Sequence, residues 1–221
     1  MKNIEIELKF QILDENQARN FLKSLDLINK KRIVDIYLDT RDAKLYKNGF
    51  FIRIRDNRTL DFKYNLRDME GKHEHCEEHS FSLPLKVDSL DEINQVCKAL
   101  GLLGISSPSL EEFKIKNNFI DSMIIDKIRE LYKDEDFGFC FDDVKEMGEF
   151  LEVEAYASKE ENLEEVKNKM RERIKGLKLK LITTGYNELY WKKHNIEIYK
   201  QGKYFLEEDK NEKSKIQTDK G

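Results

Sequence analysis

Two short segments of the chain carry acidic side chains at a spacing that suits metal binding. Near the N-terminus, Glu5, Glu7 and Lys9 alternate with apolar residues. Successive side chains of a β-strand point to opposite faces of a sheet, so these three ionisable groups would share one face. The same pattern returns at Glu152 and Glu154. Two such strands lying close together would offer four carboxylates to a hard divalent cation, which prefers oxygen ligands.

Cationic side chains recur at the same two-residue spacing. Arg53 and Arg55 would share one face of a strand, with apolar residues on the other face. Lys114 and Lys116 repeat this arrangement, and Lys63 closes a further alternating segment. An isolated strand of this kind is commonly an edge strand whose charges lie in water. Several of them with a continuous apolar side instead favour a barrel with a charged interior, which would bind a polyanion together with its metal ions.

The size and composition of the chain limit the number of domains. It has 221 residues, of which 39% are hydrophobic, which is enough to bury one good core. We therefore expect one domain over residues 1–194 and a C-terminal extension over residues 195–221. From about residue 207 the chain is charged and has no aromatic residue, a composition typical of disorder.

The charge balance and the cysteines limit the partners and the compartment. The chain carries 40 basic and 44 acidic residues, a net charge of -4, whereas a protein that coats nucleic acid needs a net basic surface. It has no apolar run of transmembrane length and no signal-peptide region, so we expect no membrane association. Three cysteines without Cys-x-x-Cys spacing fit a reducing cytoplasm and argue against a zinc site.

The periodicity of apolar residues predicts the elements that must position these groups. Alternation predicts strands over residues 3–10, 31–39, 51–55, 58–66, 74–83, 110–120, 122–132, 137–144 and 149–157. Helical periodicity with capping residues predicts helices starting after Asp14 or Asn16 and after Asp88 or Ser89, and over residues 160–176 and 185–193. The chain is therefore expected to be an α+β protein in which most charged candidates lie on strands.

Five motifs follow one another in a recognisable order. They are Glu5-x-Glu7-x-Lys9, Asp35–Thr40, Asn48–Arg55, the pair Phe141–Val144 and Met147–Glu154, and Thr184–Leu189. In this order they resemble the CYTH superfamily, the triphosphate tunnel metalloenzymes, which include class IV adenylyl cyclases and thiamine triphosphatases, over residues 3–192. The resemblance implies a closed antiparallel tunnel barrel of about eight strands, packed by helices, with substrate and metal inside.

The resemblance also implies a role for each charged residue of the tunnel. The ligands of Mg²⁺ or Mn²⁺ would be Glu5, Glu7, Glu152 and Glu154. The groups that hold phosphoryl oxygens would be Lys9, Arg53, Arg55, Lys63, Lys114 and Lys116. Lys9 and Asp142 would take part in catalysis. Asp142 could ligate the metal or orient a water, and a salt bridge with a tunnel lysine is an equal alternative.

Three positions depart from the family pattern. The fifth strand usually carries Arg-x-Glu-x-Glu, and the two registers available here present either Cys76, Glu78 and Ser80 or His75, Glu77 and His79. The usual Lys-x-Arg is taken to be Lys114-x-Lys116, which keeps the charge and loses the arginine fork. Asp61 stands where a small hydroxyl residue is often found. We expect these changes to alter substrate preference and to leave the metal site intact.

The residues and the resemblance together predict a metal-dependent phosphohydrolase that acts on an inorganic or small organic triphosphate. The first alternative is a class IV-type adenylyl cyclase, which converts ATP to cyclic AMP and pyrophosphate. The second is a non-catalytic module that binds polyphosphate or nucleotide, and such a module has no need of four carboxylates in its interior. The expected partner is a small-molecule triphosphate, and a homodimer is compatible with the sequence.

Overall fold

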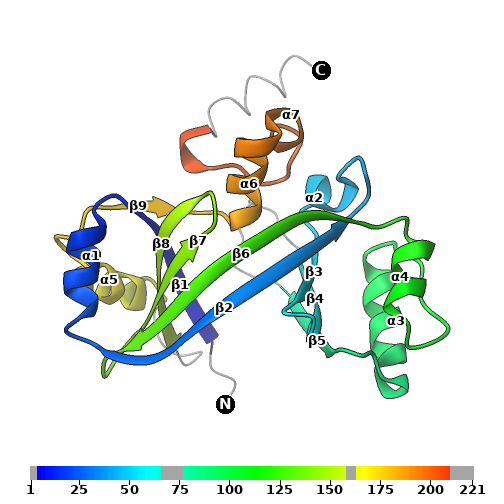
Figure 1. The fold of residues 1–221 in the computed structure, drawn as a ribbon, viewed down its shortest axis with the longest axis horizontal. Coiled ribbons are helices and arrows are strands. Elements are labelled where there is room, and N and C mark those ends of the chain that lie inside the picture. The colour runs from blue at the N-terminus through cyan, green and yellow to red at the C-terminus, as the bar shows by residue number, and fades with distance from the viewer. Residues whose placement is uncertain (1–3, 66–76, 158–162, 210–221) are drawn as a thin grey trace. The chain divides into compact units, whose positions relative to one another are not determined.

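The computed structural model describes residues 4–65, 77–157 and 163–209 of the chain (Figure 1). Its strands are β1 (Ile4–Ile12), β2 (Asp26–Asp39), β3 (Phe51–Arg55), β4 (Thr59–Tyr64), β5 (Glu77–Ser82), β6 (Ile120–Lys133), β7 (Gly138–Val144), β8 (Gly148–Ala157) and β9 (Leu179–Ile182). Its α-helices are α1 (Glu15–Leu22), α2 (Lys44–Asn48), α3 (Leu90–Ala99), α4 (Leu110–Lys116), α5 (Leu163–Arg173), α6 (Tyr186–His194) and α7 (Ile196–Tyr199). Short 3₁₀ helices are η2 (Val87–Ser89) and η3 (Glu207–Asp209).

The strands form one sheet in the order β5-β4-β3-β2-β6-β7-β8-β1-β9. The expected α+β class with a large antiparallel sheet is confirmed. The expected closed barrel of eight strands is wrong, because the described residues form nine strands and the outer strands β5 and β9 do not pair with each other. The strand that was not predicted, β9, pairs with β1 from Lys9 to Ile12 and is the outer strand on that side of the sheet.

The chain divides into two compact units. Unit 1 combines residues 1–33 with residues 126–183, and unit 2 combines residues 34–125 with residues 184–221. The long strands β2 and β6 each contribute residues to both units. In each unit, alternation along the strands separates an apolar face from a charged one.

In unit 1, helices α1 and α5 cover the apolar face of the sheet. The cluster that they form with strands β1, β7 and β8 includes Leu8, Leu22, Phe139, Leu151, Val153 and Met170. Helix α1 starts after Asp14, whose carboxylate accepts a hydrogen bond of 3.1 Å from the backbone N–H of Gln17. Since alternate residues of the same strands point the other way, the ionisable side chains of β1 and β8 lie on the opposite face.

In unit 2, helices α3 and α4 cover the apolar face of strands β3, β4 and β5 (Figure 1). The buried cluster includes Ile52, Leu60, Phe62, Phe81, Ile93, Val96 and Phe113. Helix α3 starts after Ser89, one of the two predicted capping residues. The alternate residues of the same strands, Arg53 and Arg55 among them, lie on the other face.

The strand predicted over residues 110–120 is wrong, because residues 110–116 form helix α4. The Ser109 side chain caps this helix by accepting a hydrogen bond of 3.1 Å from the N–H of Glu112. Leu110 and Phe113 are three residues apart, a helical spacing, and Phe113 is fully buried. The alternation of Lys114 and Lys116 therefore reflects the surface of a helix and not one face of a strand.

Residues 195–209 follow helix α6 and include helix α7. Their side chains Tyr199, Tyr204, Phe205 and Leu206 are buried. The ring of Tyr204 stacks on Phe51 with a centroid separation of 6.3 Å, so this segment packs within unit 2. Residues 210–221, on which most of the predicted disorder falls, lie outside the described residues. Among the described helices, none combines the length and the apolarity that a bilayer crossing demands.

Candidate functional site

The two acidic strands identified in the sequence are neighbours in unit 1. Strand β1 pairs with strand β8 in a register that sets Glu7 opposite Glu154 and Lys9 opposite Glu152. Glu5 lies on the same strand, opposite Tyr156, and its side chain is outside the described residues. Four of the predicted site residues are thus brought together on the charged face of this unit.

Lys9 lies between two of these carboxylates. Its Nζ is 3.2 Å from Glu7 and 3.0 Å from Glu152. Burial lowers the pKa of Lys9, but the charges of Glu152 and Glu7 outweigh burial and raise this pKa above its ordinary value. Burial likewise raises the pKa of Glu152, but Lys9 and two further cations hold it well below its usual range. Both groups therefore remain charged near neutral pH.

The two further cations are Lys127 and Arg129 on strand β6, which the sequence analysis missed. Nζ of Lys127 is 2.6 Å from Asp142. Arg129 binds both carboxylate oxygens of Asp142 at 2.6 Å and also contacts Glu152. Asp142 is fully buried and, in this structure, forms the ion pair that the sequence had left as one of its alternatives.

A signal for these residues was present in the sequence. Lys127-Ile128-Arg129 has the Lys-x-Arg spacing and lies within the predicted strand 122–132. The structure confirms that these residues lie on a strand, since β6 spans Ile120–Lys133. The sequence analysis assigned the Lys-x-Arg motif to Lys114-x-Lys116 and for this reason missed Lys127 and Arg129.

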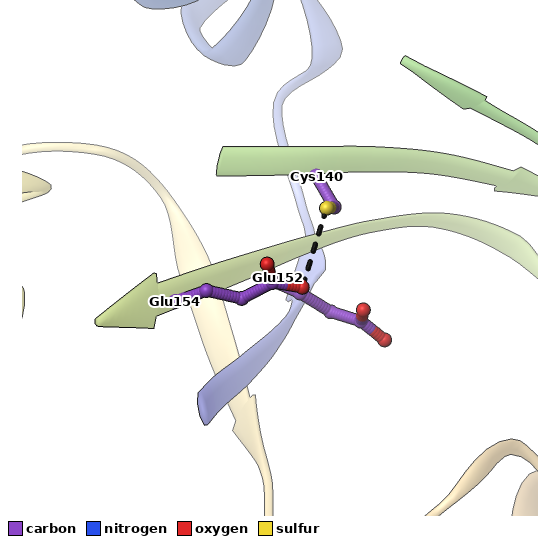
Figure 2. A group of neighbouring side chains, drawn as sticks. All are labelled: Cys140, Glu152 and Glu154. Atoms are coloured by element: carbon purple, nitrogen blue, oxygen red, sulfur yellow. Dashed lines mark hydrogen bonds between the residues drawn. The ribbon is translucent and has the colours of Figure 1, made fainter. Parts of the chain in front are cut away.

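A cysteine joins the acidic residues. Donor atoms of Cys140, Glu152 and Glu154 all lie within 4.8 Å of one another (Figure 2). The Cys140 thiol donates a hydrogen bond of 3.4 Å to Glu154. Burial raises the pKa of Glu154, and the lowering effects of Cys140 and Arg129 do not cancel this rise. The charges of Glu152 and Glu7 also raise this pKa, and a bound cation would offset their repulsion.

The donor set fits Mg²⁺ or Mn²⁺. Carboxylate oxygens are the ligands that these hard cations prefer, whereas a thiol is a soft donor. Glu152 and Glu154 converge within 4.8 Å, and Glu7 lies opposite Glu154 in the sheet. The residues that fit the metal are therefore the three glutamates, with Cys140 beside them.

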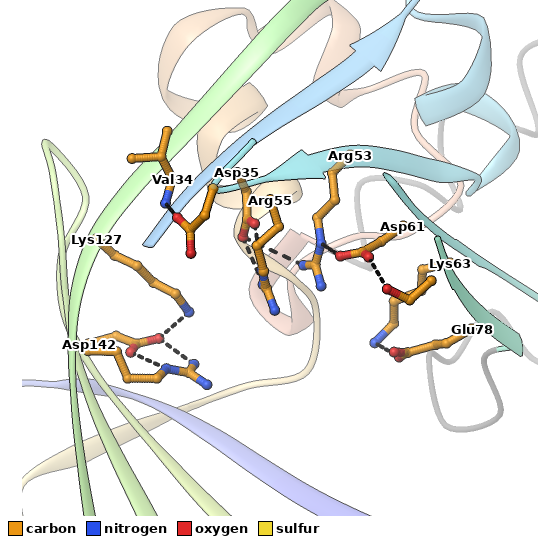
Figure 3. Close-up of polar contacts among 12 residues, drawn as sticks. Val34, Asp35, Arg53, Arg55, Asp61, Lys63, Glu78, Lys127 and Asp142 are labelled. Carbon is orange, nitrogen blue, oxygen red and sulfur yellow. Dashed lines mark hydrogen bonds and ion pairs between the residues drawn. The ribbon is translucent and has the colours of Figure 1, made fainter. Parts of the chain in front are cut away.

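Unit 2 carries a second set of charges on one face of strands β2 to β5. Arg55 binds both oxygens of Asp35 at 2.7 and 2.9 Å. Arg53 lies 3.1 Å from Asp61 and 3.6 Å from Asp35. Lys63 lies 2.8 Å from Glu78. Figure 3 shows these contacts. The structure brings together three predicted phosphate-binding cations and pairs each with a carboxylate.

The register of strand β5 decides between the two alternatives left by the sequence. Ser80 pairs with Asp61 and Glu78 pairs with Lys63, so Glu78 and Ser80 share the charged face. His79 lies on the other face, where its ring stacks on Tyr64 and its Nδ1 is 3.1 Å from Glu92. Residues 73–76 lie outside the described residues.

Lys114 and Lys116 are not on the strand that was expected for them. On helix α4, Lys114 lies 2.8 Å from Asp121 and Lys116 lies 2.6 Å from Glu112. Lys114 lines an open surface groove together with Arg41. The strand predicted to carry them into the tunnel is wrong, because the segment is helical.

Comparisons with known proteins identify relatives of this chain. A family model described as the CYTH domain matches residues 3–186. A protein of Methanocaldococcus jannaschii that is named as a candidate adenylate cyclase is 30% identical over 191 residues, which cover 84% of this chain and 98% of the relative.

Solved structures share the fold. The PH1819 protein of Pyrococcus horikoshii is 21% identical, with a TM-score of 0.57 and coverage of 86% of this chain and 100% of that chain. A candidate adenylyl cyclase from Hippeastrum, described as having a dominant triphosphatase activity, is 15% identical, with a TM-score of 0.58 and coverage of 89% and 99%.

Proposed function

The chain belongs to the CYTH domain family, and from this membership we propose that it is a metal-dependent phosphohydrolase of inorganic or small organic triphosphates. One observation carries the proposal: the carboxylates of strands β1 and β8 converge around the partly buried cations Lys9 and Arg129. In the structure these acids and cations are paired with one another, which offsets the cost of burying them. A polyanion with its metal ion would suit both sets, because the metal would bind the acids and the phosphates would bind the cations.

In this proposal, the glutamates hold the metal and the basic residues hold the phosphate chain. Glu7, Glu152 and Glu154 would ligate Mg²⁺ or Mn²⁺. When bound, the cation supplies concentrated positive charge that neutralises phosphoryl oxygens and makes phosphorus easier to attack. Lys9 keeps its proton, because its pKa is raised, and would donate to an oxygen that gains charge during the displacement.

Asp142 would act on the phosphate chain through its neighbours. It holds the guanidinium of Arg129 by both oxygens and the ammonium of Lys127 by one. These contacts fix the direction in which the two cations offer their remaining hydrogen atoms. Within unit 2, considered by itself, Arg53, Arg55 and Lys63 are proposed to donate hydrogen bonds to phosphoryl oxygens, for which they would exchange their carboxylate partners.

The alternative is an adenylyl cyclase, which the name of the M. jannaschii relative favours. A cyclase must hold adenine and ribose and keep the 3′-hydroxyl in line with the α-phosphorus while excluding water. A hydrolase needs only the phosphate chain, a cation and a water. The acids and cations described above are candidates for that smaller set, which is why hydrolysis is preferred.

A screen of products tests the choice. The purified chain is incubated with tripolyphosphate, thiamine triphosphate or ATP and with Mg²⁺ or Mn²⁺, and the products are identified by phosphorus NMR. We expect orthophosphate as the main product and effective competition by tripolyphosphate against ATP. Cyclic AMP and pyrophosphate as the main products would show that the chain is an adenylyl cyclase and not a hydrolase. Binding of a triphosphate without any turnover would support the remaining alternative, a non-catalytic binding module.

A further inference from the structure

Asp61 places a carboxylate directly on one of the proposed phosphate-binding arginines. Strand β4 pairs with β3 so that Asp61 lies opposite Arg53, and with β5 so that it lies opposite Ser80. One carboxylate oxygen is 3.1 Å from Nε of Arg53 (Figure 3), and the other accepts a hydrogen bond of 2.7 Å from the Ser80 hydroxyl. Both oxygens of Asp61 are thus fixed.

Asp61 is not the only acidic partner of Arg53. Asp35 lies 3.6 Å from Arg53 and binds Arg55 through both oxygens. The side chain of Asp35 is only 4% exposed, so it supports the arginine pair from within the protein. Asp61 is 15% exposed and adds a second negative charge to Arg53. The two arginines are therefore already neutralised by two carboxylates before any phosphate arrives.

We propose that Asp61 is a specificity-determining residue that weakens the binding of bare polyphosphate and favours triphosphates whose charge is reduced by a bound cation. The inference rests on the proposed function of this site. A phosphoryl oxygen on Arg53 would lie close to Asp61, and two like charges a few Å apart in a partly desolvated site repel each other. A cation bound to the phosphate chain removes much of this repulsion.

Asp61→Asn isolates the charge of this residue. The amide oxygen can still accept from Arg53, and the amide nitrogen can donate to the Ser80 hydroxyl. Asp121→Asn is the matched control, because Asp121 is in the same unit and pairs with Lys114 at 2.8 Å. It removes the same charge from a carboxylate that does not contact the arginines.

The experiment is a titration of each protein with tripolyphosphate, by calorimetry, in metal-free buffer and with saturating Mg²⁺. In metal-free buffer we expect Asp61→Asn to bind at least about tenfold more tightly than wild type, as removal of one nearby like charge implies. With Mg²⁺ the gain should be smaller. Asp121→Asn should match wild type under both conditions. Thermal melting of each variant confirms that it is folded.

The outcomes separate this inference from the function on which it rests. Unchanged or weaker binding by a folded Asp61→Asn, while wild type binds, would overturn the inference and leave the triphosphate site standing. If Asp61→Asn gains the same affinity for tripolyphosphate with and without Mg²⁺, Asp61 does not discriminate between substrates by their charge, and the inference is overturned. If no form of the protein binds tripolyphosphate, thiamine triphosphate or ATP, the proposed function falls and the inference falls with it.

Discussion

Arg129 and Asp142 form a two-pronged ion pair in unit 1, in which Nε and Nη2 of the arginine each lie 2.6 Å from a carboxylate oxygen. The aspartate is fully buried, and the arginine extends from it to Glu152. A rigid fork of this kind sets the direction of a guanidinium more strictly than a single contact does. Asp142 is therefore best understood as a positioning residue for Arg129 and Lys127.

Replacement of Asp142 should cost stability. Asp142→Asn removes a buried charge and leaves Lys127 and Arg129 without their shared partner. Breaking a buried pair from one side typically costs about 3–5 kcal/mol. In a chain of this size, each kcal/mol lowers the melting temperature by about 2–4 °C. Calorimetry or chemical denaturation checks this, with Asp143→Asn, an exposed neighbour on β7, as control. Equal stability of the two variants would contradict the structural role.

Replacement of Glu7 should cost activity and not stability. Its side chain is 43% exposed, so Glu7→Gln should fold normally. Loss of an outer-shell partner of a metal already costs about 10–100-fold in affinity or activity, and loss of a ligand should cost at least as much. Turnover at saturating Mg²⁺ is the measurement. Glu165→Gln, which breaks a surface pair with Lys169 in the same unit, is the control. Full activity of Glu7→Gln would show that Glu7 is not a metal ligand.

Removal of either arginine in unit 2 should weaken triphosphate binding. Arg53→Ala or Arg55→Ala deletes charge-assisted donors, at a cost of about 2–5 kcal/mol in binding free energy. Arg55→Ala should also lose stability, because it leaves Asp35, 4% exposed, without its main partner. Dissociation constants are compared with those of Arg58→Ala, an exposed arginine in the same hairpin. Wild-type affinity in both variants would place these arginines outside the binding site.

The pair Glu149 and Glu15 predicts a pH dependence of stability in unit 1. Burial, and then the charge of Glu15, raise the pKa of Glu149 to about 6 from 4.5. For an acid, a raised folded-state pKa means that the folded protein holds its proton more tightly than the unfolded chain. The contribution of Glu149 therefore favours folding at low pH and is lost as pH rises from about 4.5 to about 6.

Glu149→Gln tests this sign. The variant should be more stable than wild type at pH 7.5, and the difference should vanish below pH 4.5. Urea denaturation of both proteins across this range gives the result. A difference that grows as the pH falls would show the opposite sign.

The sequence predicted the charged strands well because their pattern is local. Alternation at Glu7 and Lys9, and again at Glu152 and Glu154, predicted that each pair shares a face, and the structure pairs these two strands. The same alternation gave a wrong prediction at Lys114 and Lys116, because two charged residues two positions apart can lie on the exposed side of a short helix as well as on one face of a strand. Only the cap at Ser109 and the buried Phe113 distinguish the two.

Other features could not be predicted from local patterns. The acidic partners of Arg53, Asp61 and Asp35, come from two neighbouring strands, and this depends on cross-strand register. Closure of the sheet depends on which edges meet, and no local pattern encodes that β9 pairs with β1. Lys127 and Arg129 were visible as a pair, but their partner Asp142 became apparent only once strands β6 and β7 were aligned.

The pairing of β1 with β8 also sets the time at which the site can form during synthesis. Ribosomes make Glu7 long before Glu154, which lies opposite it in the sheet, and all of residues 34–125 come between the two parts of unit 1. Pairing of segments so distant in the chain costs loop-closure entropy before any contact repays it. Until β8 and α5 emerge, Ile6 and Leu8 lack most of the apolar residues that they pack with in the structure. A nascent chain that stalls before residue 154 therefore exposes an unpaired strand β1 and lacks the carboxylates of strand β8 that are proposed to bind the metal.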